Sequence, residues 1–552
     1  MAKKYASQFE TVEGRRSDQT LNSVGAVTFK VTPWVQMERF LVLGSEGGSY
    51  HVGEQELIRE NAINLVKCIQ QDGSRAVDLI VDVSDSGRSH KNNAALFALA
   101  VAASDSSEET RRRAFDALPK VARTATHLFT FVSYMENLRG WGKAPRKAIS
   151  SWYTGKEPKT IAYQMVKYQQ RNGWSHRDLL RLAHPVAKSP EQDALFRWAV
   201  SGKDGLSDVV RRVGKGANQK HYTREDLSGF LHPQIEAFEE IKRLDESDVQ
   251  NAVRLIEDYD LPREAVPTHF LNSVDVWSVL LNRMPMTAAI RNLATMTRNG
   301  TLDVPANKER VMEMITNEDH LKRSRIHPLQ VLMAHKTYAQ GRGVRGSATW
   351  AVDRSIVKAL DQAFYKTFKN VEPTGKRVCL ALDVSGSMGG MWGSQSVLSP
   401  REIVAALALV TLNTEQNAKV IGFSNEIMEL KLKPNMTLEN ACNYMTGLPF
   451  GSTDAAAPFL WSLERGLEFD AFGVYTDNDT GTGSFWGRHR QSLQPAEALR
   501  KYRNETGIPA KLAVLATEPY NYTIADPKDA GMLDICGFDG SVPAVISDFF
   551  RS

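Results

Sequence analysis

Apolar residues recur every three to four positions along most of the chain from about Trp34 to about Phe368. Clear examples run over Gln55–Ile69, Asn92–Ala103, Ser107–Ala122 and Asp178–Leu182. This spacing predicts amphipathic helices, and short turns containing Gly, Pro or Asp separate one helix from the next. Many short helices in series indicate a helical solenoid, and because no clean period is visible, any repeats must be degenerate.

The pattern changes after a linker at residues 370–376. The later chain alternates short apolar runs with helical stretches. The apolar runs are Val378–Leu382, Ala418–Phe423, Phe472–Tyr475 and Lys511–Ala516, and the helical stretches include Arg401–Asn413 and Pro495–Glu505. Buried strands that alternate with helices predict a mostly parallel, doubly wound α/β sheet. We therefore expect a polar N-terminal segment over 1–27, a helical-repeat module over 28–370 and an α/β domain over 371–552.

Charge is divided unevenly between these parts. The 552 residues carry a net charge of +4. Residues 371–552 hold 15 Lys and Arg against 21 Asp and Glu, which leaves 53 against 43 in residues 1–370. A basic first part favours a polyanionic partner. Solvated helix faces explain the same charges equally simply, so charge alone decides nothing.

Cysteine usage and the lack of long apolar runs bear on location. The cysteines, Cys68, Cys379, Cys442 and Cys536, are far apart and form no CxxC pair. This spacing excludes a zinc ribbon and argues against a disulfide framework. The start of the chain has no apolar signal core, and no apolar run approaches the roughly 18–20 residues of a membrane helix. We expect a cytoplasmic protein without membrane contact, and a monomer.

The sharpest local signal is the DxSxS pattern of Asp383, Ser385 and Ser387, directly after an apolar strand. Further along the chain, Thr453 lies in a GxTD sequence and Asp477 ends another strand. Hard divalent cations take oxygen ligands, and Mg²⁺ keeps several waters in its octahedron. The ends of parallel strands meet at one edge of a sheet, where ligands bind. The five residues therefore predict a site for a divalent cation, most simply Mg²⁺. In the alternative, these oxygens bond only to backbone.

A second informative segment is YQMVKYQQRNGWSHRDLLRLAHP, residues 163–185. Lys167 and Arg171 are four apart, so on one helix they would share a face. Ser175 is a candidate N-cap with Asp178 three residues on. Basic groups interleaved with aromatic rings suit phosphate contacts and base stacking, although an ordinary amphipathic hairpin fits as well. His184, further along, could be a surface histidine or a contact.

Another basic cluster lies in LRGWGKAPRKAI. It contains Arg139, Lys143, Arg146 and Lys147, which are further candidates for binding nucleic acid. Catalytic signatures are missing from the sequence: it has no HExxH motif, no GxSxG elbow and no Walker A loop.

Several long segments of the sequence resemble one family. They are FLVLGSEGGSY, HLFTF, KYQQRNGWSHRDLLRL, MPMTAAIRNL, RIHP, FYKTFKNVEPTGKR, LALDVSGSM, TDNDT and IADPKDAGMLDICGFD. They span roughly Thr28 to Phe549, and they resemble the Ro autoantigen family, in which a TROVE module precedes a von Willebrand factor A domain. The chain looks like a bacterial-type member. It departs from the family in a Gly-rich extension at 388–396 and again at 481–494.

The resemblance implies a ring of HEAT-like helical repeats followed by an α/β domain with a metal site. In this family, Y-like small noncoding RNA binds the outer surface, at positions that correspond here to Lys167, Arg171 and His184. Misfolded noncoding RNA threads its 3′ end through the central hole, and bacterial members work with a 3′–5′ exoribonuclease. The two serines and the threonine of the metal site coordinate directly, and an acidic group of a partner completes it.

Three functions follow as hypotheses. The first is an RNA-binding scaffold for noncoding-RNA quality control, with no chemistry of its own. The second is a metal-dependent nuclease, which the sequence supports poorly because only two aspartates approach one ion. The third is a metal-dependent protein-interaction module whose basic charge is incidental. Copurifying RNA discriminates the first from the third, and RNA cleavage that depends on Asp383 would identify the second.

Overall fold

A computed structural model describes residues 19–21, 27–30, 33–43, 62–85, 92–203, 206, 211–213, 220–222, 224–343, 347–384, 398, 400–424, 426–446, 448, 453–476, 493–516, 522–526, 528–536 and 542–551. Its contacts form two compact units. We call Leu65–Val311 the helical unit, and Met1–Asn64 together with Met312–Ser552 the mixed unit. The boundaries expected at 28 and 371 stay predictions. No described helix is long and apolar enough to cross a membrane.

The helical unit is built almost entirely of short helices. They are α2 (Ile63–Gln71), α3 (Gly73–Asp85), α4 (Asn93–Ala102), α5 (Glu108–Val121), α6 (Ala125–Leu138), α7 (Lys143–Thr154), α8 (Pro158–Lys167), α9 (His176–Ala183), α10 (Pro190–Ser201), α11 (Arg224–Gly229), α12 (Pro233–Ile241), α13 (Val249–Tyr259), α14 (Val274–Arg283), α15 (Met286–Arg298) and α16 (Pro305–Thr316). Two hairpins interrupt them: β3 (Gln170–Arg171) with β4 (Trp174–Ser175), and β5 (Arg211–Val213) with β6 (Lys220–Tyr222).

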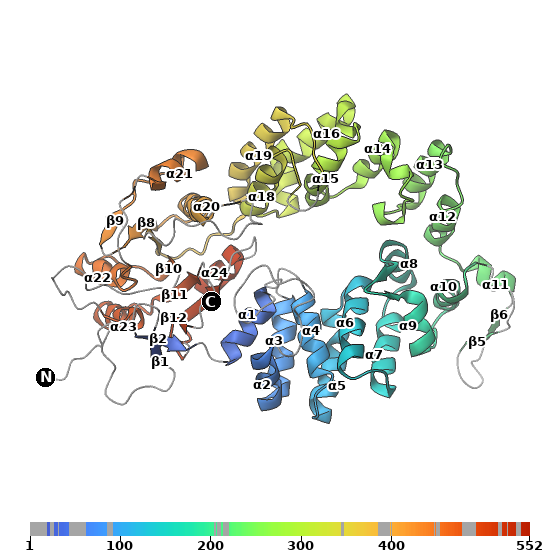
Figure 1. Cartoon of the computed structure of the whole chain (residues 1–552), viewed down its shortest axis with the longest axis horizontal. Coiled ribbons are helices and arrows are strands. Elements are labelled where there is room, and N and C mark those ends of the chain that lie inside the picture. The colour runs from blue at the N-terminus through green and yellow to red at the C-terminus, as the bar shows by residue number, and fades with distance from the viewer. Residues whose placement is uncertain are drawn as a thin grey trace. The chain divides into compact units, whose positions relative to one another are not determined.

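Helices two places apart in the chain pack together. Helix α3 contacts α5, α4 contacts α6, α5 contacts α7 and α7 contacts α9. Figure 1 shows α3 to α10, coloured from blue to teal, following one another side by side. This i to i+2 contact pattern is typical of a two-layer helical solenoid. The predicted solenoid is therefore confirmed for this unit.

Helix α4 lies in the interior of the stack. Every residue from Ala94 to Ala102 is buried, which fits a helix that is hydrophobic all round. Its neighbour α5 is amphipathic and begins at Ser107, whose side chain accepts a hydrogen bond from the Thr110 amide. Both helices lie within a residue of the ranges expected from apolar spacing.

The mixed unit combines helices with a sheet. Its elements are β1 (Gln19–Leu21), β2 (Val27–Lys30), α1 (Pro33–Leu43), α17 (Glu318–Ser324), α18 (Pro328–Ala339), α19 (Arg354–Lys366), β7 (Val378–Asp383), α20 (Pro400–Thr414), β8 (Ala418–Phe423), β9 (Ile427–Glu429), α21 (Leu438–Thr446), α22 (Ala457–Glu464), β10 (Ala471–Thr476), α23 (Pro495–Thr506), β11 (Lys511–Ala516), β12 (Tyr522–Thr523), β13 (Met532–Cys536) and α24 (Val542–Arg551).

The main sheet has six strands in the order β13-β11-β10-β7-β8-β9. All pairs are parallel except β8 with β9, which is antiparallel. The predicted doubly wound domain is confirmed. Strand β7 lies in the interior of the sheet and ends at Asp383, so this carboxylate sits at the edge where ligands bind in such sheets.

Chain from near the N-terminus completes this domain. Strand β2 pairs with β1 and with β12, which makes a second, three-stranded sheet. Phe29 of β2 is 2% exposed and lies in one core with Phe459, Phe472 and Tyr502. Part of the segment expected to be a polar N-terminal extension is therefore a strand, and β2 packs against residues more than 400 positions away.

Candidate nucleic-acid interface and metal site

Lys167 and Arg171 do not share a helix face. Helix α8 ends at Lys167, and Arg171 lies in β3, paired with Trp174 of β4. The turn between these strands is Asn172-Gly173, and both residues have positive φ, 52° and 79°. Asn-Gly is a strong signal for a two-residue hairpin, because both turn positions need the left-handed region. The expectation of one helix was wrong, and this dipeptide could have corrected it.

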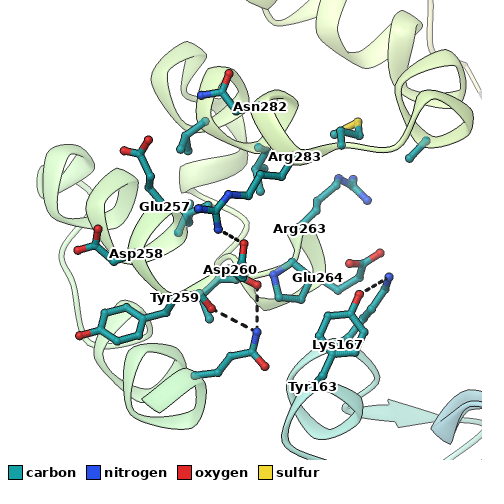
Figure 2. Close-up of a pocket in the computed structure, with 18 of the residues that line it drawn as sticks. Tyr163, Lys167, Glu257, Asp258, Tyr259, Asp260, Arg263, Glu264, Asn282 and Arg283 are labelled. Carbon is teal, nitrogen blue, oxygen red and sulfur yellow. Dashed lines mark hydrogen bonds and ion pairs between the residues drawn. The ribbon is translucent and has the colours of Figure 1, made fainter. Parts of the chain in front are cut away.

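Lys167 is held at the end of α8 by aromatic side chains. Its Nζ donates a hydrogen bond to the Tyr163 hydroxyl at 3.0 Å and lies 5.3 Å from that ring and 5.5 Å from the ring of Tyr168. Figure 2 shows this bond across one turn of α8. Burial by itself lowers the pKa of Lys167, but the bond to Tyr163 and the charges of Tyr168 and Glu264 raise the pKa above its ordinary value. The side chain therefore stays cationic.

The short helix α9 follows the hairpin with the expected start. Ser175 and Asp178 form a reciprocal capping box. The helix ends at His184, which is exposed and has φ of 47°, and whose amide donates to the Leu180 carbonyl. His184 thus presents its ring to solvent at a fixed helix end, where a ligand could reach it.

His176 is a buried junction that the sequence did not reveal. It is 5% exposed, although it lies among polar residues in the sequence. One ring nitrogen lies 2.8 Å from the Tyr153 hydroxyl, and the other lies 3.0 Å from the Tyr168 carbonyl oxygen. Burial lowers the pKa of His176 to about 4. The neutral ring thus joins α7 to the segment that carries Lys167 into the hairpin.

The second basic cluster divides into two kinds of residue. Arg139 donates to the Ala103 carbonyl at 2.6 Å and lies 5.5 Å from the ring of Phe115, so it holds helices together. Lys143, Arg146 and Lys147 are exposed on α7. Their spacing of three and four residues places them on one face. Within the described ranges these three cations have no ion-pair partner.

Two tryptophans connect the basic segments. Trp141 lies two residues before α7 begins, and its ring lies 5.6 Å from that of Trp174 in β4. Helix α6 contacts both β3 and β4, and α7 contacts α9. The cations of α7 and the hairpin with Arg171 therefore lie on neighbouring elements. We call this the α7–α9 surface: Lys143, Arg146, Lys147, Lys167, Arg171 and His184 with the two tryptophans.

Two of the five predicted metal ligands lie in the described chain. Asp383 is 3% exposed at the end of β7, and its Oδ2 accepts a hydrogen bond of 2.7 Å from Thr476 at the end of β10. Thr453 is 7% exposed, and the next amide, of Asp454, donates to the Ser424 carbonyl just after β8. Ser385, Ser387 and Asp477 lie outside the described residues, as do residues 388–396 and all but the last two residues of 481–494.

The described geometry fits an oxygen-ligand site at this edge. Neighbouring strand ends bring a buried carboxylate and buried threonines to the same side of the sheet. Thr476 is a positioning residue that sequence reasoning missed, since it fixes one oxygen of Asp383 and precedes Asp477. Over the residues described, no three His, Cys, Asp or Glu side chains form a metal cluster. The predicted site also uses hydroxyl oxygens of serine and threonine, so the absence of such a cluster does not test it. The metal site therefore stays a prediction.

Comparison with known proteins identifies both parts of the chain. A family model of the TROVE domain matches residues 20–337, and a model of the Ro60 vWA domain matches residues 377–550. Among curated proteins, "RNA-binding protein RO60" of Caenorhabditis elegans is 38% identical, over 99% of this chain and 92% of its own length. The protein of the same name from Deinococcus radiodurans is 35% identical, over 97% and 95%.

A solved structure agrees with the sequence relatives. The crystal structure of the Deinococcus radiodurans RO (RSR) protein has a TM-score of 0.73 and 35% identity, and the similarity covers 94% of this chain and 99% of that one. The family resemblance inferred from these sequence segments is thereby confirmed. The chain belongs to the Ro60 family, whose members join a TROVE domain to a vWA domain.

Proposed function

We propose that this chain is an RNA-binding subunit of a small ribonucleoprotein, and that it acts without chemistry of its own. The observation that carries the proposal is the α7–α9 surface. There, cations on one helix face that have no ion-pair partner among the described residues adjoin a hairpin with a further arginine. Cations that neutralise phosphates release counterions and so supply much of the affinity for nucleic acid. The relatives' name, RNA-binding protein, supports the same conclusion.

The ligand we propose for this surface is a Y-like small noncoding RNA. Half-buried aromatic and exposed basic side chains suit a structured RNA with a duplex and unpaired nucleotides. By family resemblance, the proposal extends to misfolded noncoding RNA, bound by its 3′ end, and to a 3′–5′ exoribonuclease as partner. The protein's own part is then to hold and present RNA.

RNA sequencing of copurifying material tests this proposal. We expect one small structured RNA to be enriched with the wild type and lost from a Lys167→Ala, Arg171→Ala, His184→Ala variant, because three contacts on the α7–α9 surface are removed. The matched control is Lys358→Ala, Lys431→Ala, Lys433→Ala, which removes three exposed lysines of the mixed unit. If wild type and variant carry the same nonspecific RNA, the proposal is wrong, and a metal-dependent protein partner becomes the better account.

We also propose that the vWA domain binds a divalent cation, Mg²⁺ in the simplest case, through Asp383, Ser385, Ser387, Thr453 and Asp477. The buried, hydrogen-bonded carboxylate of Asp383 supports this. When bound, the ion supplies an open coordination position for an acidic group of a partner. Thr476 keeps Asp383 oriented, and hydroxyl and carboxylate oxygens are the ligands that Mg²⁺ prefers.

Removal of the metal gives a direct test of this site. We expect millimolar Mg²⁺ to raise the melting temperature of the EDTA-treated wild type, because a ligand that binds only the folded state stabilises it. Asp383→Ala is expected to abolish this increase. Asp470→Ala, at the opposite end of the sheet, is the control and should retain it. An equal response of Asp383→Ala and wild type to Mg²⁺ would contradict the assignment.

A further inference from the structure

A cavity of about 830 Å³ opens inside the helical unit, apart from the metal site. One wall is α8, and the other runs from the end of α13 to α15 (Figure 2). Small-molecule sites have volumes of roughly 300–1,000 Å³. The cavity is thus large enough for one nucleotide and too small for a duplex.

The inner lining of the cavity includes buried apolar side chains. Ile256, Leu261, Val279 and Leu280 line it, and each is less than 9% exposed. The aromatic ring of Tyr163, 36% exposed, lies at the α8 side. The flat face of a nucleobase can therefore stack here on a preformed surface.

Four carboxylates belong to the lining of the cavity, and one of them is paired. Asp260 forms an ion pair with Arg283, and its carbonyl oxygen accepts a hydrogen bond of 3.0 Å from Gln234. Glu257 and Asp258, at the end of α13, also line the cavity (Figure 2). Glu264 is the acidic group whose charge acts on Lys167.

Cations remain on both walls of the cavity. Lys159 and Lys167 come from α8, and Arg263 from the segment after α13. The guanidinium of Arg263 lies 5.5 Å from the ring of Trp277, a buried residue of α14. Because Arg283 pairs with Asp260, these three cations share the lining with the carboxylates of Glu257, Asp258 and Glu264. A phosphate at the rim and a base inside match this arrangement.

We propose that this cavity binds one unpaired nucleotide, with its base on Tyr163 and the apolar lining and its phosphate at Lys167 and Arg263. The proposal rests on the RNA-binding function above, because Lys167 belongs both to the α7–α9 surface and to the cavity. RNA lying on that surface can thus insert an unpaired nucleotide next to it. The same chemistry would accept a free nucleotide, so the test includes both sources.

Two RNA probes test the cavity with the full-length protein. One is a labelled duplex with a single unpaired adenosine, and the other is the same duplex fully paired. We expect the wild type to bind the first about tenfold more tightly, since stacking of one base on an aromatic ring contributes about 1–3 kcal/mol. Fluorescence anisotropy measures both affinities at the same salt concentration.

Two variants alter the cavity in different ways. Ala288→Leu fills it from α15, and Arg263→Gln removes a rim charge. Each is expected to reduce the tenfold preference to less than about threefold, while affinity for the paired duplex changes little. Ala294→Leu is the control, because it enlarges a half-buried alanine of α15 that does not line the cavity.

The possible outcomes separate this inference from the function on which it rests. If the wild type binds both duplexes tightly and equally, and does not bind adenosine monophosphate, the cavity is no nucleotide site, although the RNA-binding function stands. If neither duplex binds beyond nonspecific affinity, the proposed function fails as well. Adenosine monophosphate that competes only with the unpaired probe supports the cavity, and monophosphate binding without any preference among duplexes identifies a free nucleotide as its ligand.

Discussion

Replacing Lys143, Arg146 and Lys147 together with glutamine is expected to weaken RNA binding on the order of 100-fold at about 0.15 M salt. Each phosphate contact contributes about 0.9 to the slope of log K against log salt for a nucleic-acid duplex. Loss of three contacts therefore flattens the slope by about 2.7. At about 0.15 M salt, this change in slope corresponds to a fall in affinity on the order of 100-fold. The three cations are exposed on one face and have no ion-pair partner among the described residues.

The matched control removes equal charge elsewhere. Lys358→Gln, Lys431→Gln, Lys433→Gln changes three exposed lysines of the mixed unit, and affinity should fall less than about threefold through the general loss of positive charge. Filter binding or anisotropy over a salt series measures both constant and slope. Equal effects of the two triple variants would mean that α7 holds no specific contact.

Acidification below about pH 6.5 is expected to destabilise both units strongly. Burial lowers the pKa values of His127, His176 and His327 from 6.5 to about 4. The unfolded chain then binds more protons than the folded chain, so stability is complete above pH 6.5 and is lost as pH falls toward 4. By pH 5 each histidine accounts for about 2 kcal/mol, and the three together for roughly 6 kcal/mol.

Urea unfolding at pH 7.5, 6 and 5 measures this loss. His176→Gln removes one buried titration, so its stability should fall by roughly 2 kcal/mol less over this range, whatever its stability at pH 7.5. His184→Gln removes an exposed histidine and should follow the wild type. A wild-type free energy of unfolding that stays constant from pH 7.5 to pH 5 would show that these histidines are not buried as neutral groups.

Regular elements of the fold were predictable because a buried face requires apolar residues at a regular spacing in the sequence. Strands β8 and β11 have the same bounds as the apolar runs that predicted them, and α23 differs from its expected range by a single residue. These elements bury one face or both, so apolar spacing reports them directly. The short strands β9 and β12 were missed, since two or three residues are too few to show a period.

Contacts between residues far apart in the chain could not be predicted from such spacing. Nothing local in residues 27–30 indicates that Phe29 enters the core of the C-terminal domain. Likewise, His176 lies in a polar run, and only the tertiary fold places the Tyr153 hydroxyl and the Tyr168 carbonyl beside its ring. Buried polar groups of this kind are specified by partners far away in the chain, and one sequence does not reveal such partners.

The candidate site was predicted in part. The cluster with Lys143 was proposed from its composition; its side chains are exposed, and its role in binding stays a prediction. The relation of Arg171 to Lys167 was wrong, because the Asn172-Gly173 turn outweighed helical spacing. Strand ends placed Asp383 at the ligand edge correctly, but its partner Thr476 followed only from the register of β10 against β7.

The wild-type arm of the salt series tests the central claim most directly. It measures the dissociation constant of the full-length protein for a small structured RNA between about 0.05 and 0.4 M salt. The account predicts a constant below about 1 µM at 0.15 M salt and a slope of log K against log salt of about −3 or steeper. A constant that stays in the nonspecific range of roughly 10⁻⁴–10⁻⁶ M, with a shallow slope, would contradict RNA binding as the function of this chain.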